Sequence, residues 1–311
     1  MNLLDRRWAL ALVLLLGCDL IEARQGQLEA SMRRAGLVES WEQVGPARLH
    51  VWSGGEGPTV LLLHGFGAET IWQWPAQVRA LIGDHRLVLP DLLWFGGSES
   101  TDRDFRIERQ VDAVEALLES YGEERVAVVG ISYGGLVAHE LGSRRPDLVP
   151  CVALLDSPGR AYTDADYAAL LERFGVEHPA PLLVPTDGAG VQRLVDLAYF
   201  RPPTVPESVR QQILTHHYDH HSAEKVELLE AVVGQMDELR AQAKDLAVPT
   251  LLLWGEQDPV FPVEIGRRLK NRLGDLAELQ VIPRAKHAPN LEHPAVVNRA
   301  LREFFDGRCG P

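Results

Sequence analysis

Residues 126–135 read Val-Ala-Val-Val-Gly-Ile-Ser-Tyr-Gly-Gly, and this stretch decides how the rest of the chain is interpreted. Four apolar residues, three of them β-branched, predict a buried strand that runs into a Gly-x-Ser-x-Gly pattern and then a helix. A serine at such a sharp turn has a strained backbone, so Gly130 and Gly134 must lack side chains for the chain to pass. Ser132 would then project its hydroxyl beyond the sheet edge, although the pattern alone also fits an ordinary glycine-rich turn.

On either side of this stretch, patterns typical of buried strands alternate with patterns typical of amphipathic helices. Strands that alternate with helices predict a mostly parallel sheet flanked by helices, which is an α/β fold. The expected strands lie at residues 44–52, 59–63, 86–89, 151–155, 250–254 and 278–282, and the expected helices at 72–82, 106–121, 263–273 and 294–305.

The alternation stops between residues 157 and 247, where the chain is richer in proline and polar residues. This segment shows helical patterns and no clear strand. We interpret it as a helical cap inserted into a core made of residues 44–156 and 248–311. The helical patterns of the cap lie near residues 164–174, 190–199, 207–218 and 223–243.

The composition limits the classes of partner and cofactor. A formal net charge of −13 argues against nucleic acid, because phosphate binding requires clustered lysine and arginine. The three cysteines are widely spaced and predict neither a disulfide framework nor a zinc site. Cys151 in particular is expected to be a buried strand residue rather than a disulfide partner.

The N-terminus has the features of an export signal. Arg6 and Arg7 precede an apolar run that is too short to cross a bilayer as a helix. The run ends in Leu-Leu-Gly before Cys18, which resembles a bacterial lipoprotein signal in which the cysteine is diacylated and becomes the new N-terminus. A plain secretory signal or an uncleaved anchor with an incidental cysteine is the alternative.

This interpretation divides the N-terminal region into a signal peptide at residues 1–17 and a tether with a leading helix at residues 18–43. Asp19, directly after the cysteine, resembles the inner-membrane retention signal of Gram-negative lipoproteins. We therefore expect an extracytoplasmic protein that is anchored by lipid to a bacterial membrane, with the periplasmic face of the inner membrane favoured.

Two residues downstream of Ser132 are candidates to activate its hydroxyl, which needs a base and a group that orients the base. Asp258 follows an expected strand in Trp-Gly-Glu-Gln-Asp-Pro, and His287 follows the last expected strand. The order Ser, acid, His is the one expected for this type of turn. Taken singly, a loop aspartate and a loop histidine are often only solvent-exposed.

A candidate oxyanion site accompanies them. His-Gly-Phe-Gly at residues 64–67 follows a buried strand, and the backbone N–H of Phe66 can point to the same place as that of Tyr133. Two such donors would stabilise a tetrahedral oxyanion. The alternative is a simple tight turn.

Together these motifs resemble the α/β-hydrolase superfamily, and most of all its lipase, esterase and monoacylglycerol-lipase branch. The resemblance implies that Ser132 is the nucleophile, His287 the base, Asp258 its orienting acid, and Phe66 and Tyr133 the oxyanion donors, with no metal or other cofactor. Related dehalogenases and epoxide hydrolases have an aspartate as nucleophile, so Ser132 argues against those reactions. The resemblance rests on His64-Gly65-Phe66-Gly67, Asp91 with Gly96-Gly97-Ser98, Gly130-Ile131-Ser132-Tyr133-Gly134, Trp254-Gly255-Glu256-Gln257-Asp258 and His287.

Two features leave alternatives open. Some members of the superfamily take the acid from an earlier strand end, which in this chain is Asp156. The histidine-rich run at residues 216–221 has the spacing of a metal site on a helix, but it lacks an evident carboxylate partner. We expect these histidines to be solvated or to pack within the cap.

The leading hypothesis is a serine hydrolase that cleaves acyl or lipid-like carboxylic esters through an acyl-enzyme. A carbon–carbon bond hydrolase or a cofactor-free perhydrolase could use the same residues. A non-catalytic ligand-binding protein on this fold is the alternative from another class. The sequence does not fix the acyl-chain length or the oligomeric state.

Overall fold

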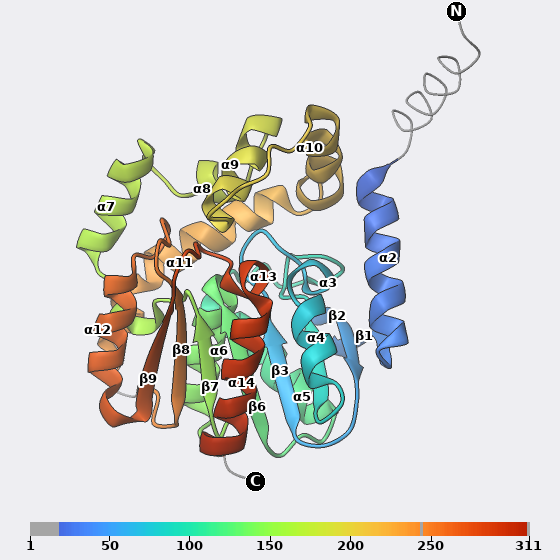
Figure 1. Cartoon of the computed structure of the whole chain (residues 1–311), viewed down its shortest axis with the longest axis vertical. Coiled ribbons are helices and arrows are strands. Elements are labelled where there is room, and N and C mark those ends of the chain that lie inside the picture. The colour runs from blue at the N-terminus through green and yellow to red at the C-terminus, as the bar shows by residue number, and fades with distance from the viewer. Residues whose placement is uncertain (1–18, 243–244, 310–311) are drawn as a thin grey trace, which may run out of the picture.

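The computed structural model describes residues 19–242 and 245–309. A twisted sheet in the order β1-β2-β4-β3-β6-β7-β8-β9 forms its centre (Figure 1), and the short β5 pairs with β2 outside this path. The pairings from β4 onward along this order are parallel, whereas β1–β2 and β2–β4 are antiparallel. The strands are β1 (Leu37–Val44), β2 (Ala47–Gly54), β3 (Thr59–Leu63), β4 (Arg86–Pro90), β5 (Glu99–Ser100), β6 (Val126–Ile131), β7 (Val152–Leu155), β8 (Thr250–Gly255) and β9 (Ala277–Ile282).

The central strands are buried on both faces, which explains their continuous apolar sequences. In β6, Val126 and Val128 face one hydrophobic cluster, whereas Val129 and Ile131 face the other. This alternation follows from the two-residue period of a strand. The sheet therefore separates two cores and holds the two helical layers apart.

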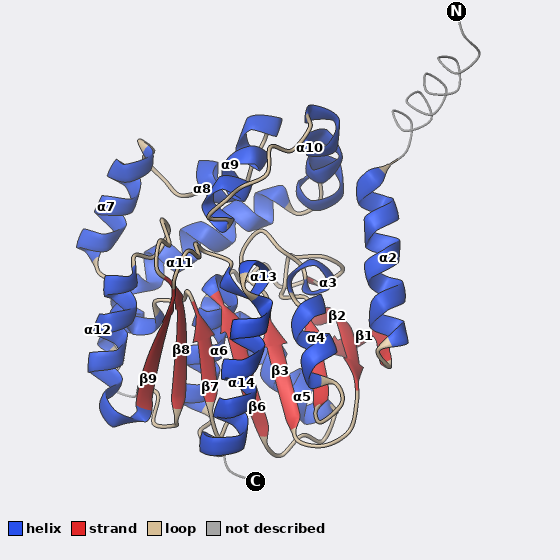
Figure 2. Ribbon diagram, in the orientation of Figure 1, coloured by secondary structure: helices blue, strands red, loops and turns tan. Residues whose placement is uncertain are grey.

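Helices cover both faces of the sheet (Figure 2). One layer consists of α5 (Ile107–Ser120), α6 (Ser132–Arg144) and α12 (Val263–Leu273), whose apolar residues belong to the first cluster. The other consists of α2 (Leu20–Arg34), α4 (Pro75–Leu81) and α14 (Pro294–Arg308), whose apolar residues belong to the second. This arrangement confirms the predicted mostly parallel sheet flanked by helices.

The segment between β7 and β8 lies above the carboxyl ends of the strands (Figure 1). Among its described residues, the regular elements are all helical. They are η1 (Gly159–Ala161), α7 (Asp164–Phe174), α8 (Ala180–Leu183), α9 (Gly188–Ala198), α10 (Glu207–Ile213), the π-helical turn η2 (Leu214–Tyr218) and α11 (Ser222–Ala241). We call this segment the cap.

The N-terminal region differs from the expected tether. Helix α2 was expected, but β1 occupies residues 37–44 and pairs along its whole length with β2. Its sequence carries Glu39 and Glu42, and only its terminal residues Leu37 and Val44 are buried. An edge strand of this kind lacks the apolar run that revealed the central strands. Cys18 and the rest of residues 1–18 lie outside the described residues.

Two further expectations need correction. The helix expected at residues 72–82 is divided into α3 (Thr70–Gln73) and α4, because Pro75 has no N–H to continue the first helix and instead begins the second. Cys151 is buried as expected, but it forms a disulfide with Cys309, 158 residues later, at the end of α14. The prediction that it has no disulfide partner was wrong, since the closing helix returns to the amino end of β7.

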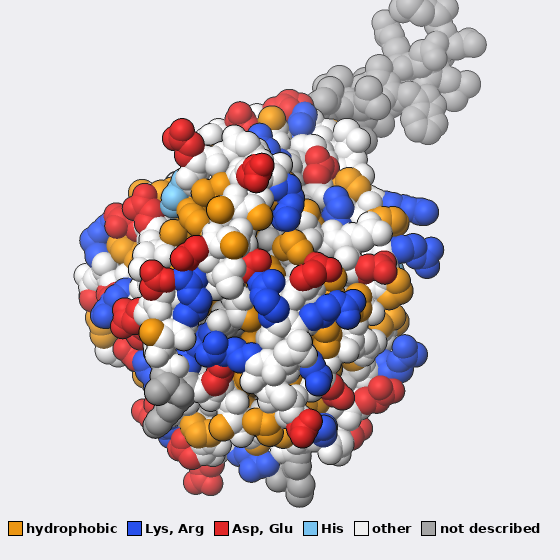
Figure 3. Space-filling view, turned by 90° about the vertical axis from the view of Figure 1, so that its left-hand side faces the viewer, with side chains coloured by type: hydrophobic (Ala, Val, Ile, Leu, Met, Phe, Trp, Pro, Cys, Tyr) orange, Lys and Arg blue, Asp and Glu red, His pale blue; other side chains and the backbone are white. Residues whose placement is uncertain are grey.

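The remaining short elements are η3 (Gly274–Leu276) and α13 (Pro289–Glu292), which lie on either side of β9. Among the described residues, no helix combines the length and the apolar character that a membrane span requires. Figure 3 shows acidic and basic side chains interspersed on the face of the molecule that includes α7 and α12. Arg268 of α12 and Asp166 of α7 form an ion pair between these two helices.

Candidate functional site

Ser132 lies at the turn from β6 into α6, where its φ is +52°. This left-handed conformation is rare and costly for a residue with a side chain, and the surrounding structure must hold it in place. A Cβ at Gly130 would overlap the carbonyl oxygen of Gly134, and a Cβ at Gly134 would overlap the carbonyl oxygens of Leu63 and His64. The expectation that both glycines must lack side chains is therefore confirmed.

The structure brings Ser132 into contact with His287. The Oγ of Ser132 lies 2.9 Å from Nε2 of His287, and Nδ1 of the same ring lies 2.8 Å from Oδ2 of Asp258. If Nδ1 carries the proton and donates it to the carboxylate, Nε2 is left as an acceptor for the serine hydroxyl. Three residues from three separate loops thus form one continuous hydrogen-bonded chain.

Asp258 is fixed by its own backbone contacts. The Oδ1 atom accepts hydrogen bonds from the amides of Val260, at 2.8 Å, and Phe261, at 3.1 Å. The other carboxylate oxygen is thereby directed to His287. The ring of Phe261 also packs against the His287 ring in an edge-to-face arrangement with centroids 5.6 Å apart.

Asp156, the alternative acid, lies at the end of β7 but makes a different contact. Its Oδ1 accepts a hydrogen bond from the amide of Gly255 at 2.8 Å, and its buried Oδ2 has no partner among the described residues. Burial, together with the neighbouring charge of Asp258, raises the pKa of Asp156 well above its usual range. The hydrogen-bonded contact with His287 belongs to Asp258.

The two residues that carry the candidate oxyanion donors are neighbours in the structure. The N–H of Tyr133 is in the first turn of α6, where a helix leaves its amides without an intrahelical acceptor. Neither this amide nor that of Phe66 donates a hydrogen bond within residues 19–242 and 245–309. The side chains of Phe66 and Tyr133 meet edge to face, with ring centroids 5.6 Å apart.

His64 fixes the loop that carries Phe66. It is fully buried, with Nδ1 2.9 Å from the carbonyl oxygen of Gly65 and Nε2 accepting a hydrogen bond from the amide of Leu92 at 2.9 Å. Burial lowers the pKa of His64. The ring is therefore neutral, with Nδ1 as its donor. It connects the loop that carries Phe66 to the loop that carries Leu92.

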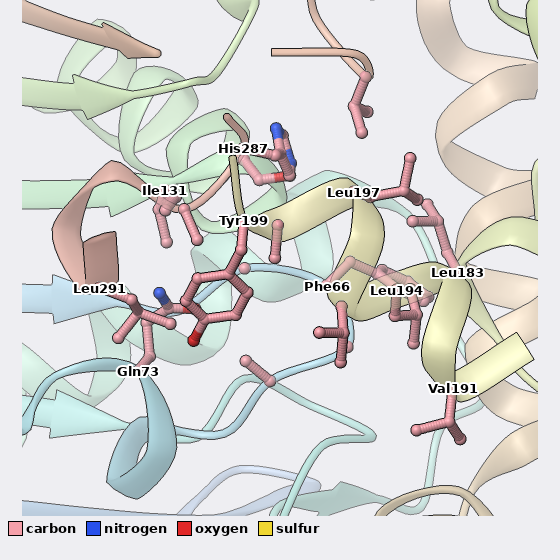
Figure 4. A pocket seen from close by; sticks show the side chains of 18 of the residues that line it. Phe66, Gln73, Ile131, Leu183, Val191, Leu194, Leu197, Tyr199, His287 and Leu291 are labelled. Carbon is pink, nitrogen blue, oxygen red and sulfur yellow. The ribbon is translucent and has the colours of Figure 1, made fainter. Parts of the chain in front are cut away.

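A cavity of about 260 Å³ adjoins Ser132 and His287. We call it the first cavity. Figure 4 shows His287 at one end of it and a group of aliphatic side chains from the cap on the far side. This lining is predominantly apolar, with Leu183, Val191, Leu194, Leu197, Val260 and Leu291 as its principal aliphatic members. The space can accommodate a hydrocarbon group next to the serine.

The cap also contacts the loop that carries His287. The amide of His287 donates to the carbonyl oxygen of Leu197 at 3.4 Å, and the amide of Ala288 donates to that of Ala198 at 3.2 Å. In addition, Nζ of Lys286 donates to the carbonyl oxygen of Asp196 at 2.6 Å. Helix α9 and the histidine loop are thus joined by three hydrogen bonds.

The histidine-rich run packs between the cap and its neighbours, whereas the sequence favours solvated histidines or packing within the cap and indicates no carboxylate partner. His216 lies 2.5 Å from Asp19 at the start of α2, and His217 lies 3.0 Å from Glu69. His221 packs edge to face on Trp94. Within the described residues, no group of three or more histidine, cysteine, aspartate or glutamate side chains is arranged to hold a metal ion.

Several residues of the site were not identified from the sequence. Tyr218, Tyr199 and Gln73 line the first cavity, and the hydroxyl of Tyr218 donates to the carbonyl oxygen of Gly67 at 3.1 Å. Their sequence contexts carry no motif that indicates such a role. Only the position of the cap above the sheet brings the two tyrosines to this cavity.

Comparisons with known proteins agree with this architecture. Residues 58–294 match the family described as alpha/beta hydrolase fold. The chain is 30% identical over 261 residues to a pimeloyl-[acyl-carrier protein] methyl ester esterase of Chromobacterium violaceum, covering 81% of this chain and 96% of the relative. It is 26% identical over 294 residues to epoxide hydrolase 3 of Xenopus tropicalis, covering 83% of this chain and 74% of the relative.

A solved structure is similar over nearly the whole length. The crystal structure of a membrane phospholipase A, described as a bacterial virulence factor, superimposes with a TM-score of 0.75 at 27% sequence identity. The superposition covers 97% of this chain and 98% of the phospholipase. The similarity therefore includes the cap region as well as the sheet.

Proposed function

We propose, from the premise that this chain belongs to the α/β-hydrolase family, that it hydrolyses carboxylic esters with acyl or lipid-like chains. The observation that carries the proposal is the hydrogen-bonded chain from Ser132 through His287 to Asp258 beside the apolar first cavity. A serine hydroxyl becomes a useful nucleophile when a base accepts its proton and an acid orients that base.

In the proposed reaction, Nε2 of His287 accepts the hydroxyl proton while Oγ of Ser132 attacks the ester carbonyl carbon. The amides of Phe66 and Tyr133 stabilise the negative charge on the carbonyl oxygen. His287 then returns the proton to the departing alcohol, which leaves an acyl group on Ser132. A water molecule that loses its proton to His287 releases the acid and restores the serine.

The apolar lining of the first cavity supports an acyl chain as the group retained on the serine. Burying hydrocarbon in such a space contributes about 0.8 kcal/mol for each methylene group. One relative is named a methyl ester esterase and one similar solved structure is named a membrane phospholipase A, and these names support an ester of acyl or lipid type as the substrate. The relative named epoxide hydrolase 3 favours another reaction, but the family resemblance implies an aspartate nucleophile for epoxide hydrolases, whereas this chain has Ser132.

The test uses p-nitrophenyl esters with acyl chains of graded length and an organophosphate that labels active serines. The Ser132→Ala variant should lose ester turnover and labelling. Ser143→Ala is a matched control, because Ser143 is also buried on α6 but its hydroxyl bonds the carbonyl oxygen of His139. Equal activity in wild type and Ser132→Ala would refute the proposal, as would absence of labelling in folded wild-type protein.

We also propose that the protein is extracytoplasmic and anchored to a bacterial membrane through a diacylated Cys18, with the periplasmic face of the inner membrane favoured. The basic and apolar residues before Leu-Leu-Gly-Cys support an export signal. The disulfide between Cys151 and Cys309 supports an oxidising compartment. Mass spectrometry of the mature N-terminus from a bacterial host tests the anchor, and an unmodified Cys18 would contradict it.

A further inference from the structure

Tyr218 of the cap is hydrogen-bonded to the loop that carries the Phe66 amide. Its hydroxyl donates to the carbonyl oxygen of Gly67 at 3.1 Å, and the tyrosine is only 4% exposed. The two residues fit closely, since a Cβ at Gly67 would lie 3.0 Å from the tyrosine oxygen. A residue of the cap therefore holds the backbone one residue beyond a candidate oxyanion donor.

The loop is held from two sides. On the core side, His64 contacts the carbonyl oxygen of Gly65, which belongs to the same peptide group as the Phe66 amide. On the cap side, Tyr218 holds the carbonyl oxygen of Gly67. Gly67 has a φ of +84°, and glycine adopts positive and negative φ about equally well. The backbone beyond Phe66 therefore depends on an external contact to keep one conformation.

Packing supplies little of this restraint. Gly67 and Tyr218 line the first cavity, and both also line a second cavity of about 250 Å³. Their hydrogen bond therefore lies between two open spaces. A buried hydrogen bond in such a position has no neighbouring side chain that can replace it when it is lost.

Tyr218 is itself fixed by the turn that carries it. This turn, η2, is wound as a π-helix, a rare form that is frequent at functional sites. The Nζ atom of Lys225 donates to the carbonyl oxygens of His217, at 2.7 Å, and His220, at 3.1 Å. The same atom lies 5.4 Å from the centre of the Tyr218 ring. The buried lysine thus secures the backbone on both sides of Tyr218 as well as its ring.

Other contacts join η2 to the same part of the core. Nδ1 of His217 lies 3.0 Å from Oε1 of Glu69, and the ring of His217 meets Trp72 edge to face with centroids 5.2 Å apart. The side chain of Phe66 packs against the apolar cluster of the cap to which Tyr218 belongs. The conformation of the loop is therefore linked to the position of η2.

We propose that Tyr218 is a positioning residue, through which the cap holds the Gly67 peptide, and with it the Phe66 amide, in the conformation that binds the oxyanion. This inference rests on the proposed ester hydrolysis and adds a role for the cap in the chemical step. Tyr218 donates to a backbone oxygen and takes no part in the proton transfers at Ser132. A displaced η2 would leave Ser132 and His287 in contact but would release the loop.

Tyr218→Phe removes only the hydroxyl and tests the assignment. We expect kcat for p-nitrophenyl decanoate to fall about 5- to 30-fold, less than the roughly 10²- to 10³-fold typical of losing an oxyanion donor outright. KM should change less than about twofold, because the contact acts in the transition state. Tyr162→Phe is the matched control, since Tyr162 is also buried in the cap but its hydroxyl has no hydrogen-bond partner among the described residues.

Two inhibitors separate positioning of the oxyanion donor from binding of the chain. A trifluoromethyl ketone adds to an active serine and places an oxyanion where the transition state has one, whereas the plain ketone binds without this charge. Tyr218→Phe should weaken inhibition by 1,1,1-trifluorodecan-2-one by about the same factor as kcat, and should leave inhibition by decan-2-one unchanged.

Several results would overturn the assignment. An increase in KM with unchanged kcat would show that Tyr218 only lines the first cavity. Unchanged kinetics in Tyr218→Phe, equal losses in Tyr218→Phe and Tyr162→Phe, or equal weakening of both ketones would each contradict a role in positioning the oxyanion donor.

Hydrogen exchange examines the loop without catalysis. Peptides that contain the amides of residues 65–69 should exchange faster in Tyr218→Phe than in the wild type and in Tyr162→Phe. Equal exchange in the three proteins would overturn the proposal, as would faster exchange throughout the sheet, which indicates a general loss of stability. If the wild type cleaves no ester, the proposed ester hydrolysis fails on its own, and the exchange still decides whether Tyr218 holds the loop.

Discussion

Asp156 and Asp258 follow two neighbouring parallel strands, yet only the carboxylate of Asp258 is hydrogen-bonded to His287. Asp156 instead accepts from the amide of Gly255, and burial near the Asp258 charge raises its pKa. Two adjacent buried carboxyl groups cannot both ionise cheaply, because like charges oppose each other at low dielectric. The two aspartates therefore make different hydrogen bonds, although they follow neighbouring strands.

These contacts predict different effects for two isosteric substitutions. Asp258→Asn should lower kcat by roughly 10⁴-fold, because an amide no longer holds the His287 ring in the active tautomer. Asp156→Asn should lower kcat less than about tenfold, because the amide oxygen can still accept from Gly255 and the contact between Asp258 and His287 is left in place. Turnover of a short-chain p-nitrophenyl ester measures both, and a larger loss in Asp156→Asn would assign the acid role to Asp156.

Close packing at the serine turn predicts that Gly134→Ala is destabilising. The added Cβ would overlap the carbonyl oxygens of Leu63 and His64, and backbone atoms cannot move aside as a flexible side chain can. We expect the free energy of unfolding to fall by at least about 2 kcal/mol. Urea denaturation provides the measurement. Gly234→Ala is the control, because a Cβ there meets nothing within 4 Å and alanine favours the helix by about 1 kcal/mol.

The disulfide predicts a dependence of stability on redox state. Removing the link between Cys151 and Cys309 should lower the free energy of unfolding by about 2–5 kcal/mol, because the unfolded chain is no longer constrained across a long loop. Thermal unfolding with and without a reductant measures the effect. A Cys309→Ser variant should match the reduced wild type and show no further response to the reductant.

We expect the stability of the protein to depend on pH through His139, which lies at the two connections between cap and core. This buried histidine of α6 lies 3.0 Å from Asp245, after α11, and 3.3 Å from Glu140. Glu140 in turn pairs with Arg160 at 2.6 Å, just after β7, while Asp245 pairs with Arg272. Burial alone would lower the pKa of His139, but Asp245 and Glu140 together raise it above the usual value.

The sign of the effect follows from this raised pKa. Protonated His139 stabilises the folded state fully below the unfolded-state pKa of about 6.5, and this contribution is lost as the pH rises through the folded-state pKa. His139→Gln should therefore destabilise the protein more at pH 6 than at pH 9. Urea denaturation of wild type and variant at both pH values gives the comparison. An equal difference at the two values would show that His139 contributes by packing alone.

The central sheet could be predicted because its strands are buried on both faces. Each is a short continuous apolar run bounded by turn residues, so the local sequence identifies it. Strand β1 could not be identified in this way, since most of its side chains are at least partly exposed and include Glu39 and Glu42. The pairing of β1 with β2 is a tertiary property that no run of residues in β1 reveals.

The residues of the candidate site could be predicted where they lie at the ends of predicted strands. Ser132, Asp258 and His287 each follow a predicted strand, and parallel strands bring their carboxyl ends together. The cap residues could not be assigned, because Tyr218 reaches the first cavity only through the packing of the π-helical turn η2 above the sheet. The pairing of Cys151 with Cys309 was likewise hidden, because loop closure over 158 residues leaves no local signal.

The same disulfide closes a large covalent loop within the chain. The covalent ring closed by Cys151 and Cys309 includes the cap, Asp258 and His287. A protease that cuts the cap once therefore leaves a single covalent molecule, in which the fragment bearing Ser132 stays joined to the fragment bearing His287. The nicked protein migrates as two bands in a reducing gel and as one band without reductant.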